Sequence, residues 1–328
     1  MTNPELFNKD TQAFVYGYQQ NAIQRMLDFD FACKRETPSV AAIINEGREG
    51  VHKAFFGRKE ILVPMFKSLA AASAKFPKVD VVVNFMSQRS AFQTTMEALE
   101  LPAIRTVAVI AEGVPERKTR ILAARAKELN KWIIGPATVG GLKAGCFKIG
   151  NTAGTIDNIV ESKLHRPGSV GFVSKSGGLS NECYNIIARN TDGLYEGIAI
   201  GGDAFPGSSL LDHILRYEAM PEVKMIVALG EIGGTDELKI VDALKAKRLT
   251  KPLVMWVTGT CAKMFRHGVQ FGHAGAKADS ALETADAKNA ALREAGAVVP
   301  ESFDDYGDAI RKTYETLVAK GVIVPAKD

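Results

Sequence analysis

The sequence has 328 residues, of which 46% are hydrophobic and 24% charged, and its formal net charge at pH 7 is +4. This composition is that of a globular enzyme, and the length favours two domains over one. The small net charge and the lack of a dense Lys/Arg run argue against nucleic-acid binding, and no apolar run is long enough to cross a membrane.

The four cysteines are widely separated and have neither the spacing of a disulfide framework nor that of a zinc site. We therefore interpret Cys33, Cys146, Cys183 and Cys261 as reduced thiols, and we predict no metal site. The polar N-terminal stretch lacks the apolar core of a signal peptide, which favours a soluble, cytoplasmic protein.

In the first half of the chain, short apolar runs alternate with helix-like segments, a pattern typical of parallel sheets covered by helices. The predicted strands are 13–16, 40–44, 79–83, 106–110 and 133–134, and the predicted helices begin after Gly17 and near 65–76, 90–100 and 115–130. Asp28 and Asp30 are expected to flank a turn. The pattern predicts a Rossmann-like domain over 1–155, but Gly17 stands without a G-x-G-x-x-G fingerprint, which argues against a nicotinamide dinucleotide.

A Gly/Thr-rich passage at 150–155 is predicted to connect this domain to a second α/β domain over 156–328. Its predicted strands are 170–173, 197–200, 225–229, 253–257 and 297–299. An alanine-rich helix is expected over 280–295, with a last helix after Ser302.

The stretch 271–276, Phe-Gly-His-Ala-Gly-Ala, sets one imidazole between glycines, where its side chain is open to another molecule. A histidine in such a loop could be incidental, but two further glycine-rich turns favour a functional site. We predict that His273 carries a phosphoryl group. The other histidines have no spacing that indicates metal ligation, and we interpret His52, His165, His213 and His267 as surface or core residues.

The turn 174–178, Ser-Lys-Ser-Gly-Gly, follows a predicted strand and opens a helix. Its small residues and the free N–H groups of the helix end form a potential anion site, for which we name Ser176, Gly177 and Gly178. The alternative is that Ser176 only caps the helix.

Glu231 lies in a second turn, 230–235, at the carboxyl end of the strand 225–229. Open α/β sheets place ligands at that end. A carboxylate there could accept a hydrogen bond from one imidazole nitrogen of His273 and leave the other as nucleophile. The alternative, a capping role, is weakened because Thr235, Asp236 and Glu237 already offer caps.

In the first domain, Ser87 and Arg89 follow the strand 79–83 in a polar turn. A guanidinium at the carboxyl end of a strand suits a phosphate-bearing ligand. The turns beginning at Ala111 and Gly135 end neighbouring strands. Together these turns predict a crevice for an extended, phosphorylated ligand.

These turns, in this order, resemble the α-subunit of the succinyl-CoA synthetase family, and most closely the corresponding segment of the ATP-citrate lyase family. The segments that carry the resemblance are 26–30, 38–42, 59–64, 135–141, 174–178, 193–203, the Glu231 turn and 270–276. They extend over nearly the whole chain. The Phe-Gly-His-Ala-Gly-Ala form and the neighbourhood of Thr191-Asp192-Gly193 favour the citrate family.

The resemblance implies a Rossmann-like CoA-binding domain followed by a flavodoxin-like CoA-ligase domain. It implies that an ATP-grasp partner subunit, binding most of ATP and Mg²⁺, phosphorylates His273, that the phosphoryl group passes to citrate, and that CoA attacks citryl phosphate. Ser87 and Arg89 correspond to CoA contacts, Ser176-Gly177-Gly178 to the helix end that receives phosphate or citrate, and Glu231 to the group that orients His273. Cleavage of citryl-CoA would belong to a lyase module acting in cis or in trans.

Three other functions stay open. The chain could be the small subunit of a stand-alone citryl-CoA synthetase, or a succinyl-CoA synthetase-type α-subunit that activates a different acid. It could also be a non-catalytic CoA-binding regulatory module. The acid that supports CoA consumption, and labelling of His273 from ATP, distinguish these possibilities.

Overall fold

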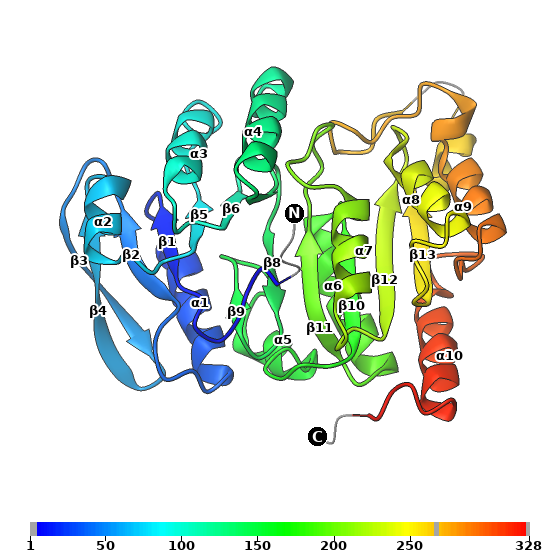
Figure 1. The fold of residues 1–328 in the computed structure, drawn as a ribbon, viewed down its shortest axis with the longest axis horizontal. Helices are drawn as coiled ribbons and strands as arrows, with labels where there is room; N and C mark the ends of the chain where they lie inside the picture. The colour runs from blue at the N-terminus through cyan, green and yellow to red at the C-terminus, as the bar shows by residue number, and fades with distance from the viewer. Residues whose placement is uncertain (1–4, 266–268, 326–328) are drawn as a thin grey trace.

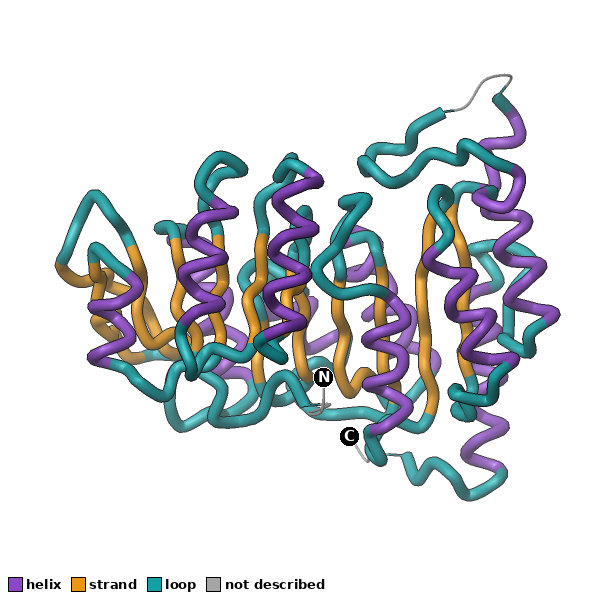
Figure 2. Tube along the Cα trace, turned by 45° about the horizontal axis from the view of Figure 1, so that its top comes forward, coloured by secondary structure: helices purple, strands orange, loops and turns teal. Residues whose placement is uncertain are grey.

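The computed structural model describes residues 5–265 and 269–325. It contains two β-sheets, one formed by the first part of the chain and one by the second, each covered by helices (Figure 1). The strands of both sheets form a middle layer between helices (Figure 2). The α/β class predicted from the sequence is confirmed.

The first sheet is built almost entirely of parallel strands. Its strands are β1 (Ala13–Tyr16), β2 (Val40–Ile44), β3 (Gly50–Phe56), β4 (Lys59–Phe66), β5 (Val81–Asn84), β6 (Thr106–Val109) and β7 (Trp132–Ile134). They lie in the order β3-β4-β2-β1-β5-β6-β7, and only the edge strand β3 is antiparallel to its neighbour. Without β3 this is the strand order of the Rossmann fold, as predicted.

Four helices accompany the first sheet: α1 (Gln20–Ala32), α2 (Leu69–Lys75), α3 (Ala91–Glu100) and α4 (Glu116–Glu128). The prediction that Asp28 and Asp30 flank a turn is wrong, because both lie inside α1. Asp30 falls seven residues after Ile23, on the same buried face as Met26 and Leu27, so it continues the apolar stripe of the helix. Its carboxylate accepts a hydrogen bond from the backbone N–H of Ser39 at 2.7 Å.

The hairpin β3–β4 was not expected from the sequence. The helix predicted over 65–76 begins only at Leu69, because Met65 and Phe66 still pair in β4 with β2 and Ser68 caps the helix. The hairpin extends the first sheet beyond β2 and forms one wall of a pocket described below.

The second sheet contains β8 (Gly140–Lys143), β9 (Phe147–Lys148), β10 (Val170–Ser174), β11 (Leu194–Ala199), β12 (Met225–Glu231) and β13 (Leu253–Thr258). The accompanying helices are α5 (Ile156–Glu161), α6 (Gly177–Asn190), α7 (Leu210–Ala219), α8 (Asp236–Lys245), α9 (Ala285–Glu294) and α10 (Tyr306–Ala319), with short 3₁₀ turns at Thr260–Met264 and Ala281–Glu283.

The parallel strands of this sheet lie in the order β11-β10-β12-β13. This is the flavodoxin-like order, in which a fifth strand would follow β13. The predicted strand 297–299 occupies that place only as a single parallel bridge between Val254 and Val298.

The two sheets divide earlier in the chain than the expected boundary after residue 155. β8 pairs with β11 in antiparallel register, Gly140 opposite Ala199, and β9 extends the same edge. The change from the first sheet to the second therefore falls between Ile134 and Gly140. The Gly/Thr-rich passage at 150–155, which suggested a connection, leads from β9 into α5.

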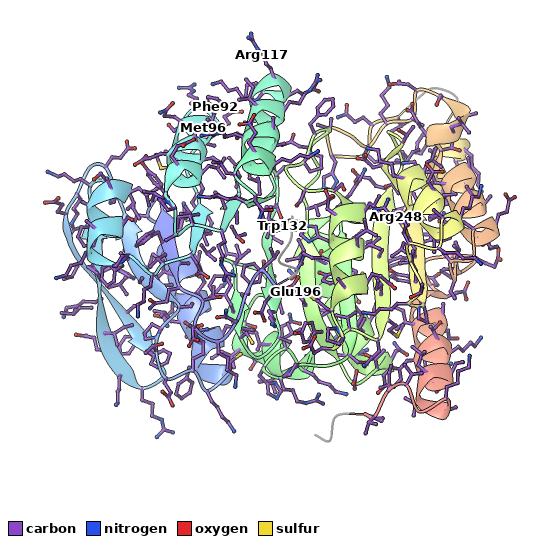
Figure 3. All side chains as sticks on the ribbon, in the orientation of Figure 1. Phe92, Met96, Arg117, Trp132, Glu196 and Arg248 are labelled. Atoms are coloured by element: carbon purple, nitrogen blue, oxygen red, sulfur yellow. The ribbon has the colours of Figure 1, made fainter. Side chains whose placement is uncertain are left out.

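One hydrophobic cluster runs through both sheets. It includes Val15 and Ile134 of the first sheet together with Phe172 and Val227 of the second. At the junction, the ring of Trp132 lies 5.2 Å from that of His213 in α7 (centroid to centroid). Figure 3 places Trp132 at this junction, in the middle of the molecule. The two halves are packed as one body.

Candidate active site at the carboxyl edges of the two sheets

In both sheets the strand order reverses beside the first parallel strand, and open α/β folds bind ligands outside the carboxyl ends of the strands at such points. In the first sheet this point lies between β1 and β5, where Ser87 and Arg89 follow. In the second it lies between β10 and β12, where the 174–178 turn and Glu231 follow. The fold thus brings the predicted residues to two ligand-binding edges.

His273 lies in the segment that connects β13 to α9. This segment crosses the upper edge of the second sheet in Figure 1. Its ring packs on Gly202, in the loop that follows β11. A Cβ atom on Gly202 would lie 2.3 Å from Cγ of the imidazole, so only glycine leaves room for this ring. The loop that holds Gly202 therefore forms the seat of His273.

His273 and Glu231 form the hydrogen bond expected from the sequence. Nδ1 of His273 donates to Oε2 of Glu231 at 2.6 Å. The Glu231 side chain is largely buried, whereas about one third of the His273 side chain is exposed (33%). This hydrogen bond raises the pKa of His273 above its usual value, against the opposing effect of burial. Since Nδ1 is engaged, Nε2 is the ring nitrogen left to react.

A buried lysine that the sequence reasoning missed holds the Glu231 turn. Nζ of Lys288, in α9, donates to the backbone oxygens of Glu231 at 2.9 Å and Gly233 at 2.6 Å, and to Oε2 of Glu237 at 2.6 Å. The other oxygen of Glu237 accepts the N–H of Glu231 at 3.2 Å. Lys288 and Glu237 are fully buried, so this pair anchors the carboxyl end of β12 from below.

The turn 174–178 joins β10 to α6 on the strand next to β12. Oγ of Ser176 accepts the N–H of Leu179 at 3.3 Å, so Ser176 caps the helix, as in the structural alternative. Gly177 and Gly178 are the first helical residues, and their N–H groups have no acceptor inside the helix. A Cβ on Gly178 would meet no atom within 4 Å, so a ligand can approach the backbone there.

Lys175, in the same turn, is a second functional candidate that was not predicted. Its ammonium lies 3.5 Å from Oε1 of Glu237, and its positive charge acts to lower the pKa of His273. No hydrogen bond joins His273 directly to residues 176–178 in the described part of the chain. The histidine and the helix end are instead neighbours along one sheet edge, with Lys175 between β10 and the Glu231 turn.

Ser87 and Arg89 are exposed at the carboxyl end of β5. The backbone oxygen of Ser87 accepts the N–H groups of Ser90 and Ala91, which fixes the turn at the start of α3. Within the described residues the guanidinium of Arg89 has no ion pair or hydrogen bond. It is therefore available to a ligand, and the structure brings it to the first sheet's edge but not into contact with His273.

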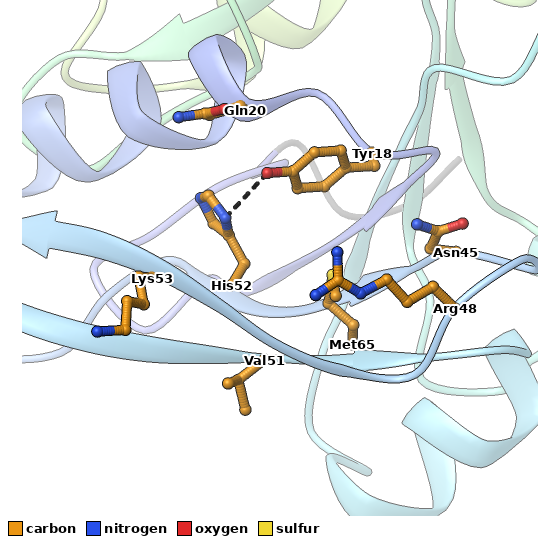
Figure 4. A pocket seen from close by; sticks show the side chains of 8 residues that line it. All are labelled: Tyr18, Gln20, Asn45, Arg48, Val51, His52, Lys53 and Met65. Atoms are coloured by element: carbon orange, nitrogen blue, oxygen red, sulfur yellow. Dashed lines mark hydrogen bonds between the residues drawn. The ribbon is translucent and has the colours of Figure 1, made fainter.

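A separate pocket of about 220 Å³ lies over the carboxyl ends of β1 and β2 and against the hairpin (Figure 4). Nδ1 of His52 and the hydroxyl of Tyr18 lie 3.1 Å apart across it, and Arg48 and Lys53 supply positive charge. Ser87 and Arg89 are not among the residues that line it. The sequence of β3 gives little sign of this wall, because its buried residues are His52 and Ala54 whereas Val51 and Phe55 are exposed.

Three backbone hydrogen bonds connect the first domain to the His273 loop. The N–H of Ala137 donates to Ala111 (2.8 Å), that of Gly202 to Ala137 (3.3 Å), and that of Gly275 to Gly202 (3.3 Å). These hydrogen bonds thus connect the loop after β6 to the loop after β7, and that loop to the Gly202 loop on which His273 packs. The predicted turns at Ala111 and Gly135 belong to these loops.

The largest cavity beside the His273 loop has a volume of about 960 Å³. It lies between the two domains, since Arg120 of α4 lines one side and Lys175 and Gly275 line the other. Among the described residues, no group of three or more His, Cys, Asp or Glu side chains is arranged to hold a metal ion. In the same part of the chain, no helix combines the length and apolar character needed to cross a bilayer.

The other histidines fit the surface-or-core interpretation where they are described. His213 is buried against Trp132, with Nε2 2.8 Å from Oγ of Ser208, and burial lowers its pKa. His52 is also buried, beside Tyr18. His267 lies outside the described residues. The four cysteines are free thiols.

Comparison with known proteins agrees with this geometry. The family model described as a CoA binding domain matches residues 8–113, and the model described as CoA-ligase matches residues 173–298. ATP-citrate synthase beta chain protein 1 of Arabidopsis thaliana is 60% identical over all 328 residues. Human ATP-citrate synthase is 59% identical over 325 residues, which is 98% of this chain.

The chain belongs to the ATP-citrate synthase family. It spans about half the length of the plant relative (54%) and 29% of the human one, so it corresponds to one portion of these proteins. A solved structure of ATP citrate lyase from Methanothrix soehngenii, in complex with citrate and coenzyme A, superimposes with a TM-score of 0.98 at 62% identity. It is matched over 99% of this chain and 53% of its own. The family assignment predicted from the turns is therefore confirmed.

Proposed function

We propose that this chain carries the phosphohistidine and CoA sites of an enzyme that forms citryl-CoA from citrate, CoA and ATP. The observation that carries the proposal is the 2.6 Å hydrogen bond between Nδ1 of His273 and Glu231, at the sheet edge shared with the N-terminus of α6. The substrates are suggested by the related ATP citrate lyase, whose structure was solved with citrate and coenzyme A.

In the first step Nε2 of His273 attacks the γ-phosphorus of ATP, and ADP leaves. Glu231 holds the Nδ1–H tautomer and stabilises the positive charge that the ring gains as the N–P bond forms. We assign ATP and Mg²⁺ mainly to an ATP-grasp partner subunit. Mg²⁺, when bound there, would neutralise charge on the phosphates of ATP.

In the second step a carboxylate oxygen of citrate attacks the phosphorus, which gives citryl phosphate and frees His273. The N–H groups of Gly177 and Gly178, at the positive end of α6, are placed to hold the phosphoryl oxygens, with Ser176 fixing the helix start. Lys175 adds a positive charge on the same side, and its charge already reaches His273.

In the third step the CoA thiol attacks the carbonyl carbon of citryl phosphate, and inorganic phosphate leaves. We place CoA along the carboxyl edge of the first sheet, with Ser87 and Arg89 as contacts and the pocket lined by Arg48 and Lys53 as a second basic region. The inter-domain cavity then offers the path from this edge towards His273. Cleavage of citryl-CoA is assigned to a citryl-CoA lyase module, in cis or in trans.

The decisive experiment incubates the chain and its ATP-grasp partner with γ-labelled ATP. We expect acid-labile, base-stable label on this chain, lost in His273→Ala and retained in Glu294→Gln, a control at an exposed site in α9. Label that persists in His273→Ala would refute the proposal. Mass spectrometry with citrate and CoA should then detect citryl-CoA, with acetyl-CoA appearing only after a lyase is added. Succinyl-CoA formed from succinate in its place would assign the chain to the succinate enzymes.

A further inference from the structure

Asp203 is the residue after the glycine on which His273 is seated. The loop that carries it packs closely on the histidine loop, since a Cβ on Gly275 would meet Cα of Ala204 at 3.5 Å. Asp203 lines the 960 Å³ inter-domain cavity together with Lys175 and Gly275. Its Oδ2 atom is buried and has no hydrogen-bond partner. A buried carboxylate oxygen without a donor requires an explanation.

The other carboxylates that line this cavity are already engaged. Asp212 accepts the N–H of Ser209 at 2.8 Å, Asp236 pairs with Lys239 at 2.7 Å, Asp279 pairs with Lys277 at 2.8 Å, and Glu283 accepts the N–H of Asp279 at 2.8 Å. Asp203 differs from them because it lines the cavity while its buried Oδ2 atom has no donor. It is therefore the cavity carboxylate best placed to accept a proton from a ligand.

The surroundings of Asp203 connect it to the proposed CoA edge. Its pKa is raised, first by burial and then by the negative charges of Glu112 and Glu116, while His273 acts in the opposite direction. Glu112 lies in the turn after β6, and the adjoining Gly113 packs against the side-chain amide of Gln88, whose Oε1 would be 2.4 Å from an added Cβ. Asp203 thus lies between the turn that bears Ser87 and Arg89 and the reactive histidine.

We propose that Asp203 is the base that accepts the thiol proton when the sulfur of CoA attacks citryl phosphate. This inference rests on the proposed function and assigns its last step. The sulfur–carbon bond forms, the carbon–oxygen bond to phosphate breaks, and inorganic phosphate leaves with the bonding electrons. The thiol proton moves to the carboxylate of Asp203, which later releases it to solvent. No oxidant or reductant is needed.

Both the acidity and the position of Asp203 suit it to this role. A thiol is a weak acid with an ordinary pKa near 8.5, so a carboxylate of ordinary acidity is a poor base for it. Because the pKa of Asp203 is raised, the difference between its pKa and that of the thiol is smaller. A positioned base of this kind typically contributes roughly 100- to 10,000-fold to the rate. Glu231 cannot serve, because Oε2 is occupied by His273.

The test separates the thiol step from the steps before it. With the partner subunit, ATP and citrate, Asp203→Asn should take label on His273 at the wild-type rate. It should also form citryl hydroxamate normally when hydroxylamine replaces CoA, because hydroxylamine traps the acyl phosphate without a thiol proton to remove. Citryl-CoA formation should fall at least 100-fold. Asp308→Asn, on the exposed face of α10, is the matched control and should leave all three rates unchanged.

A second variant guards against a purely structural effect. Asp203→Glu keeps a carboxylate and should recover citryl-CoA formation to within about tenfold of wild type. The pH profile of the CoA step should lose its acid-side inflection in Asp203→Asn. Wild-type citryl-CoA formation by Asp203→Asn, or an equal fall in labelling, hydroxamate and citryl-CoA, would overturn the assignment. Absence of label on the wild-type chain would instead refute the proposed function itself.

Discussion

The imidazole of His273 lies directly on the backbone of Gly202, with room for a hydrogen atom but not for a methyl group. The position of His273 is thus set by a residue 71 positions earlier in the sequence as much as by its own loop.

Gly202→Ala should therefore displace the ring without unfolding the protein. The added Cβ would lie 2.3 Å from Cγ of His273, so the ring must leave Glu231 or the loop must move. We expect phosphoryl labelling of His273 to fall at least tenfold while the melting temperature changes little. Gly307→Ala is the control, because a methyl there meets the side-chain amide of Asn190 at 3.2 Å and Cγ2 of Ile186 at 3.5 Å, and neither contact is as close as that at Gly202. Normal labelling of Gly202→Ala would show that the seat is unimportant.

The rate of His273 phosphorylation should depend on pH through the imidazole. Protonated imidazole has no lone pair on Nε2, so the rate should rise with pH through the pKa of His273, which Glu231 raises above 6.5. Glu231→Gln removes the charged carboxylate whose hydrogen bond raises the pKa of His273. The inflection should move to lower pH and the plateau rate should fall. Rapid-quench labelling between pH 5 and 9 measures both; an unchanged inflection would exclude Glu231 as the cause.

Gly178→Ala should separate stability from activity. Alanine favours a helix over glycine by up to about 1 kcal/mol, and the added methyl meets no protein atom within 4 Å. The free energy of unfolding should therefore stay the same or increase. If the α6 N-terminus receives the phosphoryl group, the methyl occupies part of its space and transfer to citrate should slow about tenfold or more. Chemical denaturation and single-turnover transfer from phosphorylated His273 are the two measurements; wild-type transfer would exclude this helix end.

Lys288→Met should weaken both the fold and the Glu231 turn. Removing one partner of a buried ion pair leaves Glu237 charged in the interior, with only Lys175 at 3.5 Å, and typically costs about 3–5 kcal/mol. Labelling of the remaining folded protein should also decrease, because the backbone oxygen of Glu231 loses its donor. Lys245→Met, at the exposed end of α8, should change the free energy of unfolding by less than about 0.5 kcal/mol. Equal stability of the two variants would contradict this account.

Arg89→Ala should reduce CoA affinity by about 1.5–3 kcal/mol, the contribution of a hydrogen bond to a charged group. Calorimetric titration of the chain with CoA measures the change. Arg117→Ala, whose side chain projects from the outer end of α4 in Figure 3, should bind CoA as the wild type does. Unchanged affinity in Arg89→Ala would remove this residue from the CoA site.

The strands, and the glycine-rich turns that carry Glu231 and His273, could be predicted because apolar runs and turns are local patterns. Apolar runs ending in glycine-rich turns place polar residues at the carboxyl ends of strands, and neighbouring strands bring those ends together. The buried position of Asp30 was missed because a carboxylate reads as a turn or surface residue unless its place on the apolar stripe of α1 is recognised.

The remaining parts of the site depend on contacts between distant segments. Nothing local to Lys288 indicates that its ammonium ends beneath Glu231, 57 residues earlier, and a lysine in a helix is usually exposed. The role of Gly202 as a seat and the engagement of the cavity carboxylates likewise appear only when separate loops meet. The antiparallel addition of β8 and β9 to the second sheet follows the same rule, since its partner β11 comes some 50 residues later.

The hydrophobic cluster shared by both sheets has a consequence for how reactants travel. Phe172 and Ile134 belong to one continuous hydrophobic core. The distance between the carboxyl edge of the first sheet and that of the second is therefore fixed by packing. Closure of one half on the other would disrupt this core, so the ligand itself must span the distance between the two sheet edges. In the proposed reaction the thiol of CoA, at the end of the flexible pantetheine arm, would supply this reach.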